Sequence, residues 1–395
     1  MKKENLKINK NIEIFKPFKE GNYKMPTEVI FGRGILDELK NFPLIKNSQK
    51  IILVFGDHFK NSYFSDKLSS DLKELKKEIL IYPEKIVKSD IKTVNNLIKF
   101  CRHKDLDIIL AIGGGTVIDA SKCAAALFRN DGLIKDYIVK KTKVLKNKSL
   151  DLIVLPTTAG TGSEVTPWAT IWDTKKKKKY SLTSPFIFPK LAVIDPQLTD
   201  SLPPAVTAET GFDALAQALE SYWSVNHNPT SDKFALLSIK LCLDNLEKVV
   251  NNPDENSRDK MAKASMLTGL AFSNTQTTIC HAVSYPITAY FNIAHGQAVA
   301  ITLPEFLKFI LRTIEPKRRK FILKTMGEIN ISDAAQKINL LMRKTGLKTK
   351  LSELGIKKKN IDLIVREGFD PDRANNVPKI PTRKELKEIL EKIWS

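Results

Sequence analysis

Short apolar runs alternate with amphipathic segments along the first half of the chain, and this alternation strongly constrains the fold. Residues 50–55, 107–112 and 152–155 are almost continuously apolar and rich in β-branched side chains. Residues 62–77 and 89–103 carry apolar side chains at helical spacing. Buried strands that alternate with amphipathic helices indicate a parallel sheet with helices on both faces. The sequence therefore predicts an α/β domain with a parallel sheet.

The composition changes after Asp195 and Pro196, beyond which nearly all of the chain has helical periodicity. A chain of 395 residues is long enough for two domains with sizeable cores. Placing the boundary shortly before this change, near residue 188, predicts an α/β domain at 1–187 and an all-helical domain at 188–395. Residues 1–25 are polar and lysine-rich, and we expect them to be an extension that pairs loosely with the body of the protein.

The net charge of +20 raises the question of an anionic partner such as nucleic acid. The lysines are scattered, however, and the one dense run, 175–179, interrupts a hairpin predicted from strands at 169–173 and 180–183. Because no aromatic-interleaved basic module accompanies the charge, we expect solvated surface lysines and no nucleic-acid partner. No apolar run approaches the ~20 residues of a membrane span, so we expect a cytoplasmic protein without a membrane partner.

Two of the five histidines, His281 and His295, flank an apolar segment that Pro286 is expected to kink or end. A single histidine in such a segment is more often a core residue than a ligand. Upstream, Asp213 and Gln217 are four residues apart in a predicted helix, so they share a face. The four side chains form a candidate metal site.

The predicted helix that carries Asp213 is introduced by two prolines, and Thr207 is its expected N-cap. Cys280 adjoins His281, but neighbouring residues on a helix point in different directions, so a thiolate ligand is disfavoured.

A glycine-rich turn, Gly113 to Gly115, follows a predicted strand and opens a predicted helix that continues to Lys122. In this context bare glycines let backbone amides approach a pyrophosphate, and the helix dipole favours the anion. The turn departs from the usual G-x-G-x-x-G pattern, and a tight turn that binds nothing is the alternative.

The next predicted strand runs into the segment 156–166, which is rich in threonine and glycine. Small residues permit close approach to a ligand, and hydroxyl groups can donate hydrogen bonds to phosphate, ribose or carboxamide oxygens. Composition alone also fits a purely structural loop.

Taken together, these segments resemble the iron-containing alcohol dehydrogenase family over nearly the whole chain. That family holds its metal with Asp, a His four residues later, and two His separated by fourteen residues. Asp213, His281 and His295 match this pattern, whereas Gln217 stands where the family has its second ligand, a histidine. Tyr285 likewise replaces a histidine that lies near the substrate in many members. The resemblance implies the dehydroquinate synthase-like, iron-type alcohol dehydrogenase fold, with nucleotide in the first domain and metal in the second.

The resemblance also implies which residues bind the nicotinamide cofactor. The NAD-selective members place an acid at the end of the second strand, and the matching slot here falls on Gly56, with Asp57 one place later. We therefore expect use of both NADH and NADPH. The full set of implied cofactor-binding residues is Gly56, Asp57, Gly113, Gly114, Gly115, Thr116, Asp119, Thr157, Thr158, Thr161, Ser163 and Lys179.

The activity that these residues imply is NAD(P)H-dependent reduction of a small aldehyde to a primary alcohol. A divalent metal, Fe²⁺ by resemblance with Zn²⁺ or Mn²⁺ as alternatives, would act as a Lewis acid on the carbonyl. Tyr285 is the candidate catalytic proton donor. A metal-dependent lyase of the dehydroquinate synthase type and a nucleotide-binding protein without activity are the alternatives. We expect a homodimer or a higher homo-oligomer.

Within the family, residues 164–173 and 179–182, together with Gly56 and Gln217, most resemble the phosphonoacetaldehyde reductases, which make 2-hydroxyethylphosphonate. A dianionic phosphonate requires cationic or amide donors, and Arg373 is the candidate we select. A general short-chain alcohol dehydrogenase is the alternative.

Overall fold

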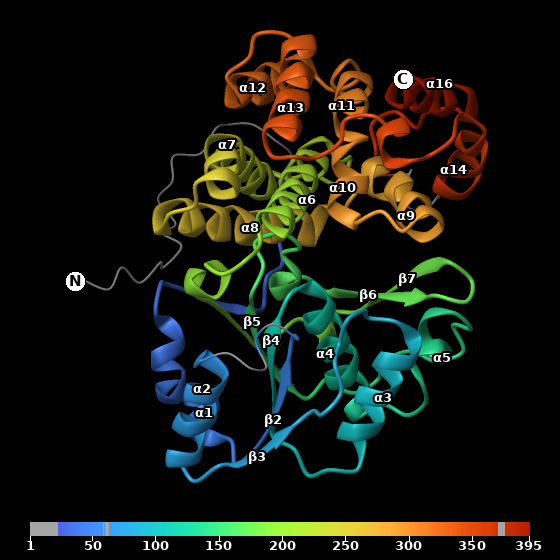
Figure 1. Cartoon of the computed structure of the whole chain (residues 1–395). Coiled ribbons are helices and arrows are strands. Elements are labelled where there is room, and N and C mark those ends of the chain that lie inside the picture. Colours follow the sequence, from blue (N-terminus) through green and yellow to red (C-terminus); the bar gives the residue numbers. More distant parts are fainter. Residues whose placement is uncertain (1–22, 58, 60–62, 370–375) are drawn as a thin grey trace. The chain divides into compact units, whose positions relative to one another are not determined.

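The computed structural model describes residues 23–57, 59, 63–369 and 376–395. Contacts divide the chain into two compact units (Figure 1). The described part of the first unit comprises 25–57, 59, 63–158 and 163–199, and that of the second 23–24, 159–162, 200–369 and 376–395. Arg373 lies outside the described residues, as does most of the extension.

The first unit is built on a six-stranded parallel sheet of order β1-β8-β5-β4-β2-β3. The two central strands β4 and β5 are almost entirely buried, as their continuous apolar sequences predict. The strands are β1 (Glu28–Phe31), β2 (Lys50–Phe55), β3 (Glu78–Ile81), β4 (Ile108–Gly113), β5 (Asp151–Pro156) and β8 (Leu191–Ile194).

Helices cover both faces of this sheet, with α1 and α2 on one side and α3, α4 and α5 on the other (Figure 1). Val94, Leu97 and Ile98 of α3 are fully buried, which fits the helical spacing of apolar side chains at 89–103. Asp90 caps this helix by accepting from the Thr93 amide. The helices are α1 (Pro43–Asn47), α2 (Tyr63–Glu74), α3 (Ile91–Arg102), α4 (Gly115–Phe128) and α5 (Ile134–Ile138), with 3-10 turns at Ile35–Asn41, Ser163–Val165, Pro185–Ile187 and Pro196–Thr199.

The predicted hairpin is present as a separate two-stranded antiparallel sheet of β6 (Trp168–Asp173) and β7 (Lys178–Thr183). Lys175 to Lys177 of the lysine run lie in the turn and are exposed, whereas Lys178 and Lys179 begin β7. The ammonium group of Lys179 lies 5.4 Å from the centre of the Trp172 ring, which is a cation–π distance.

The boundary between the units falls later than the change of composition suggests. Strand β8 belongs to the sheet, where Leu191 pairs with both Glu28 and Ile153, and the first unit continues to Thr199. A four-residue strand next to prolines carries too little periodicity to mark its sheet membership in the sequence. The structure therefore moves the division from 187 to 199.

The second unit is helical, and α6 lies at its centre, where it packs against α7, α8 and α10 (Figure 1). No described helix combines the length and apolar character needed to cross a membrane. The helices are α6 (Pro204–Trp223), α7 (Pro229–Asn251), α8 (Glu255–Thr275), α9 (Ile279–Phe291), α10 (His295–Ala300), α11 (Leu303–Leu311), α12 (Pro316–Met326), α13 (Ile331–Lys344), α14 (Ile361–Gly368) and α16 (Arg383–Trp394).

One local expectation about these helices is wrong. Helix α6 begins at Pro204 rather than after Thr207, because proline is favoured at the first helical position. The Thr207 hydroxyl instead accepts a hydrogen bond from Arg258 at 2.9 Å. Of the two effects expected of Pro286, a kink or the end of the helix, the second does not occur, since α9 continues through Pro286 to Phe291.

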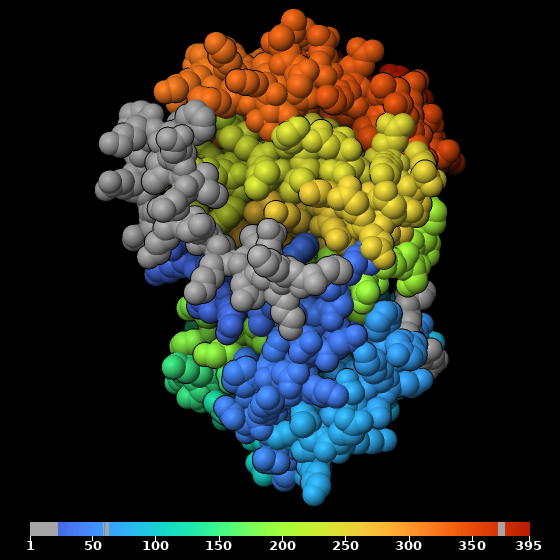
Figure 2. All heavy atoms as spheres, turned by 90° about the vertical axis from the view of Figure 1, so that its left-hand side faces the viewer, coloured from blue at the N-terminus to red at the C-terminus, as the bar shows by residue number. Residues whose placement is uncertain are grey.

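The surface of each unit can be followed in a space-filling view. On the face shown in Figure 2, the blue segments from β1 to β3 form much of the surface of the first unit, and the yellow α7 and α8 form much of that of the second.

Candidate metal centre and nucleotide loops

Three of the four predicted metal ligands come together in the second unit. One donor atom each from Asp213, His281 and His295 lies within 4.8 Å of the others. The carboxylate and the His281 ring are buried, and His295 is half-buried. This spacing is compatible with a single divalent ion between them.

Close packing of α10 on α6 places His295 beside Asp213. A Cβ on Gly296 would lie 2.0 Å from the backbone oxygen of Glu209, so only glycine permits this approach. His295 is the first residue of α10, directly before that glycine. The imidazole of His295 therefore lies next to the face of α6 that carries the Asp213 carboxylate.

Both nitrogens of His281 contact acidic groups. Its Nε2 lies 3.2 Å from Asp213 Oδ1, and its Nδ1 contacts the carboxylate of Glu220, which is fully buried. Burial alone would lower the pKa of His281, but the two carboxylates outweigh it and raise the pKa to about 9. In the metal-free protein the imidazolium thus bridges Asp213 and Glu220, and a cation at the site would take the place of its Nε2 proton.

A serine hydroxyl sets the orientation of His295. Ser284 Oγ donates to the carbonyl oxygen of His281 at 2.7 Å, which uses its only proton. The contact of 3.4 Å between Ser284 Oγ and His295 Nδ1 is therefore one in which Nδ1 donates. This tautomer leaves Nε2 of His295 as the nitrogen that can bind a metal.

Gln217 is the fourth predicted ligand, and its hydrogen bonding tests whether these residues fit a metal ion. Its Nε2 donates to Asp213 Oδ2 at 3.0 Å, and its Oε1 is buried without a hydrogen-bond partner. A buried acceptor without a partner is costly unless something else satisfies it. Two imidazoles, a carboxylate and an unsatisfied amide oxygen together fit a divalent cation, which Asp213, Gln217, His281 and His295 would hold.

Tyr285, the predicted proton donor, lies against this cluster. Its ring stacks on His295, with 5.8 Å between centroids and 28° between planes. The phenol is half-buried, so it borders the metal cluster without being enclosed by it.

The predicted nucleotide loops of the first unit meet at the carboxyl ends of adjacent strands. The Gly56 amide donates to Ile112 O at 2.8 Å, and the Thr157 amide donates to Gly113 O at 3.1 Å. The chain leaves β2 for β3 on one side, whereas β4 leads to β5 on the other. Such a point of divergence is where open α/β sheets bind ligands.

The first turn of α4 faces that same end of the sheet. Helix α4 starts at Gly115 with Gly114 as its N-cap, and a Cβ on Gly114 would lie 3.3 Å from the side chain of Thr158. Gly113, Gly114, Gly115, Thr116, Thr157 and Thr158 are thereby brought together. Their backbone amides and hydroxyls suit an anionic ligand.

Asp119, another predicted cofactor residue, accepts one hydrogen bond from the threonine-rich segment and one from strand β6. Ser163 Oγ donates to its Oδ1 at 2.5 Å, and the Thr170 amide donates to its Oδ2 at 2.8 Å. One helical turn later, the buried Lys122 donates to Thr166 O and Trp168 O, each at 2.9 Å, and burial lowers its pKa to about 8. These contacts hold residues 163–170 against α4, and binding of Asp119 to the cofactor stays a prediction.

Asp57 follows Gly56 at the end of β2 and has a cationic neighbour. Lys85 Nζ lies 2.8 Å from Asp57 Oδ1, and both side chains are largely exposed. This lysine partly offsets the negative charge that would repel a ribose 2′-phosphate. Of the other predicted residues, Lys179 lies on β7, and Thr161 is in the stretch 159–162 that belongs to the second unit.

Comparison with known families adds an independent observation. The sequence profile described as Iron-containing alcohol dehydrogenase matches residues 26–196, and the one described as Fe-containing alcohol dehydrogenase family, C-terminal, matches residues 207–394. The chain belongs to the iron-containing alcohol dehydrogenase family. The dehydrogenase interpretation is therefore preferred over the lyase alternative.

Individual relatives cover almost the full chain. Long-chain-alcohol dehydrogenase 1 of Geobacillus thermodenitrificans is 33% identical over 354 residues, 87% of this chain and 88% of that protein. NADPH-dependent butanol dehydrogenase of Clostridium saccharobutylicum is 32% identical over 383 residues, 94% of this chain and 97% of that protein. The solved structure of sulfoacetaldehyde reductase from Bifidobacterium kashiwanohense in complex with NAD+ matches with a TM-score of 0.87 and 32% identity, covering 95% of this chain and 98% of that one.

Membership of this iron-containing alcohol dehydrogenase family confirms the predicted fold class and the class of enzyme. The chain is an oxidoreductase that acts on alcohols, and its expected cofactors, a nicotinamide nucleotide and a divalent metal, are consistent with the donor set and the glycine turn. Glu220 is a residue that sequence reasoning missed. Asp213, Gln217 and Glu220 have the i, i+4, i+7 spacing of one helix face, and this spacing was the available signal.

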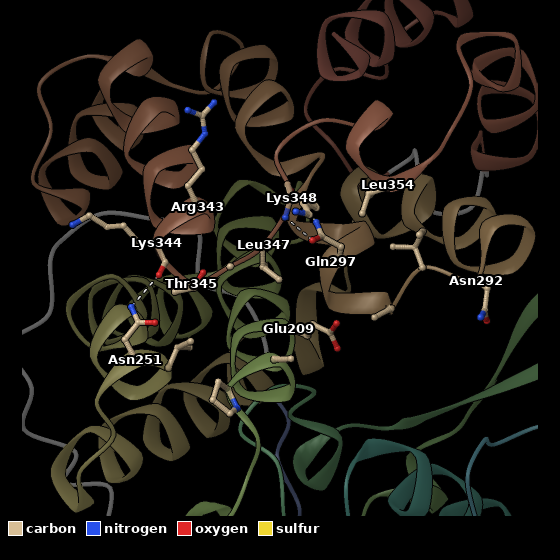
Figure 3. A pocket seen from close by; sticks show the side chains of 16 residues that line it. Glu209, Asn251, Asn292, Gln297, Arg343, Lys344, Thr345, Leu347, Lys348 and Leu354 are labelled. Carbon is tan, nitrogen blue, oxygen red and sulfur yellow. Dashed lines mark hydrogen bonds between the residues drawn. The ribbon is translucent and has the colours of Figure 1, made fainter.

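The second unit contains a pocket of about 670 Å³ (Figure 3). Its wall includes Glu209, whose pKa burial raises, and the end of α13. Asn251 donates to Lys344 O at 2.9 Å, and the Gln297 amide exchanges hydrogen bonds of 2.9 and 2.8 Å with the backbone of Lys348. None of the four residues of the metal site is among the described residues that line this pocket.

Proposed function

We propose that the protein catalyses NAD(P)H-dependent reduction of a small aldehyde to a primary alcohol at a divalent cation. The observation that carries this proposal is the convergence of Asp213, His281 and His295 within 4.8 Å. Gln217 contacts this cluster through Nε2, which donates to Asp213, and its Oε1 is buried without a hydrogen-bond partner. Each of the two imidazoles has a partner at Nδ1, which leaves Nε2 for the cation.

When bound, the cation supplies Lewis acidity toward the substrate carbonyl, and the reduced nicotinamide supplies the hydride. The protein's own contribution is to hold and orient these partners. Asp213 provides the one negatively charged donor of the set. Tyr285, stacked on His295, supplies the proton to the product oxygen.

We expect the nucleotide to bind at the carboxyl ends of β2, β4 and β5. The glycine turn would accept the pyrophosphate at the first turn of α4, where backbone amides point toward an anion. The pairing of Asp57 with Lys85 supports use of both NADH and NADPH, because it weakens discrimination against the 2′-phosphate.

We propose phosphonoacetaldehyde as the substrate, and thus a place in phosphonate metabolism. The relative that acts on sulfoacetaldehyde supports a short aldehyde with an anionic group, and its 32% identity extends over 95% of this chain. The equally similar butanol dehydrogenase supports the alternative of a neutral short-chain substrate. Arg373 remains the sequence-based candidate for contact with the anionic group.

The test is the steady-state oxidation of NADH and of NADPH by phosphonoacetaldehyde, propanal and butanal. We expect kcat/KM for the anionic aldehyde to exceed the other two at least a hundredfold, about 2.7 kcal/mol of discrimination. A smaller ratio would support the general aldehyde reductase instead. No oxidation with any aldehyde would overturn the proposed activity itself.

A further inference from the structure

Glu220 is a fully buried carboxylate on α6, two helical turns after Asp213. Four donors converge on it. Its Oε1 accepts from Thr278 Oγ1 at 2.8 Å and from the amides of Cys280 and His281 at 2.7 and 3.3 Å. Its Oε2 contacts His281 Nδ1. Because all four groups can donate, they favour the ionised carboxylate.

The carboxylate takes the place of a side-chain cap for α9. That helix starts at Ile279, and its N-cap residue Thr278 makes no capping hydrogen bond with its own side chain. The first amides of a helix have no partner within the helix, and Glu220 accepts from two of them. Glu220 therefore fixes the start of α9 and, with it, the point from which His281 projects.

The donor and the acceptor of each hydrogen bond at the Thr278 hydroxyl are fixed by chemistry. Trp223 Nε1 donates to Thr278 Oγ1 at 2.9 Å, and an indole nitrogen cannot accept. The threonine hydroxyl must therefore give its proton to Glu220. This buried chain from Trp223 through Thr278 holds the carboxylate in place beneath the imidazole.

The ionised carboxylate also determines which nitrogen of His281 carries the proton. A carboxylate can only accept, so Nδ1 must donate to Glu220. Nε2, which faces Asp213, is then the nitrogen with a lone pair once its own proton has left. A neutral amide in place of the carboxylate could present a donor to Nδ1 and favour the opposite tautomer.

Charge balance gives a second, independent reason for Glu220. A divalent cation held by Asp213, two neutral imidazoles and the Gln217 amide keeps a net charge of +1. Asp213, Gln217 and His281 are each at most 5% exposed, so water compensates little of this charge. An uncompensated buried charge is costly. The Glu220 carboxylate brings the total to zero.

We propose that Glu220 is the positioning residue of the metal centre: it holds His281 in the tautomer that binds through Nε2, and it supplies the second negative charge that a buried dication requires. This inference rests on the metal-dependent function proposed above.

The test measures metal affinity rather than activity. Zn²⁺ dissociation constants are determined by competition with a chromogenic chelator for the wild type, Glu220→Gln and Tyr222→Phe. The Tyr222 control lies on the same helix, and the variant loses one buried hydrogen bond, 2.8 Å to Arg318 O. We expect Glu220→Gln to weaken zinc binding at least tenfold, in line with the effect of a lost outer-shell partner, and Tyr222→Phe to change it less than threefold.

A second measurement needs no variant. In zinc-loaded wild-type protein labelled with ¹⁵N-histidine, we expect Nδ1 of His281 to carry the proton and Nε2 to show the shift of a metal-bound nitrogen.

The outcomes separate the inference from the proposed function. Zinc affinity of Glu220→Gln within threefold of the wild type would reduce Glu220 to a helix cap, and a proton on Nε2 of His281 would overturn the tautomer assignment. Wild-type protein that binds no zinc would overturn both claims. Loss of zinc binding in Glu220→Gln, together with a loaded wild type that reduces no aldehyde, would leave the inference standing and remove the proposed function.

Discussion

Replacing Gln217 with histidine should tighten metal binding. Gln217 is 5% exposed, and in the metal-free protein its Oε1 has no partner. An unsatisfied buried acceptor costs about 1–3 kcal/mol, which ligation to a cation would relieve, so the wild-type amide already contributes to binding. An imidazole nitrogen is nevertheless the stronger donor to Fe²⁺ or Zn²⁺.

We expect Gln217→His to lower the dissociation constant for Zn²⁺ at least tenfold, or about 1.4 kcal/mol. The gain should be smaller for Mn²⁺, which is better suited to oxygen donors. Gln217→Leu is the matched control, since it keeps an apolar stem of similar length and removes the donor oxygen. It should weaken Zn²⁺ binding by at least tenfold.

The assay is chelator competition with both metals on all three proteins, with unfolding in urea recorded in parallel. The wild-type hydrogen bond from Gln217 Nε2 to Asp213 Oδ2, at 3.0 Å, is lost in Gln217→Leu, so some loss of stability is expected in that control. Equal affinities for wild type, Gln217→His and Gln217→Leu would show that residue 217 does not bind the metal.

Three further predictions concern the fold and the cofactor. Because the pKa of His281 is raised from 6.5 to about 9, its protonation stabilises the metal-free fold fully below pH 6.5, by about 3 kcal/mol at most, and this stabilisation is lost as the pH rises through 9. Urea unfolding of chelator-treated protein should show this loss of stability, and His281→Gln should remove the pH dependence. Gly296→Ala should cost roughly 1–3 kcal/mol of stability in the same assay and abolish zinc binding, because a Cβ would lie 2.0 Å from Glu209 O. An unchanged unfolding midpoint would contradict the close packing of α10 on α6. Asp57→Asn should raise the ratio of kcat/KM with NADPH to that with NADH, and Lys85→Gln should lower this ratio. Each change should be less than tenfold because the pair is largely exposed. Changes in the opposite directions would show that Asp57 does not select against the 2′-phosphate.

The sheet and most helices could be predicted because their periodicity is local. Strands such as Lys50–Phe55 are bounded in the structure as their apolar runs predict, and α3 buries the expected face. Strand Leu191–Ile194 could not be placed, because four residues do not reveal that they insert between β1 and β5. The sequence offers two possible starts for α6, with Pro204 as its first residue or with Thr207 as its N-cap. The structure has the first, which agrees with the preference of proline for the first helical position.

The metal site was predictable to the extent that its residues share a helix face or a familiar spacing. Asp213, His281 and His295 carry that signal, and their convergence appears in the structure. The helical spacing places Glu220 on the same face of α6 as Asp213, but its contact with His281 depends on how α9 packs against α6, over 61 residues of sequence separation. The pairing of Asp57 with Lys85 is likewise a product of how the chain returns after β3.

The central claim is that this chain reduces an aldehyde with a nicotinamide at a divalent metal. The direct test is the rate of NAD(P)H oxidation by an aldehyde, measured on exhaustively chelated protein and on the same preparation after Fe²⁺, Zn²⁺ or Mn²⁺ is restored. We predict no measurable rate in the chelated protein and recovery with at least one of the metals. Full activity in metal-free protein would contradict the claim.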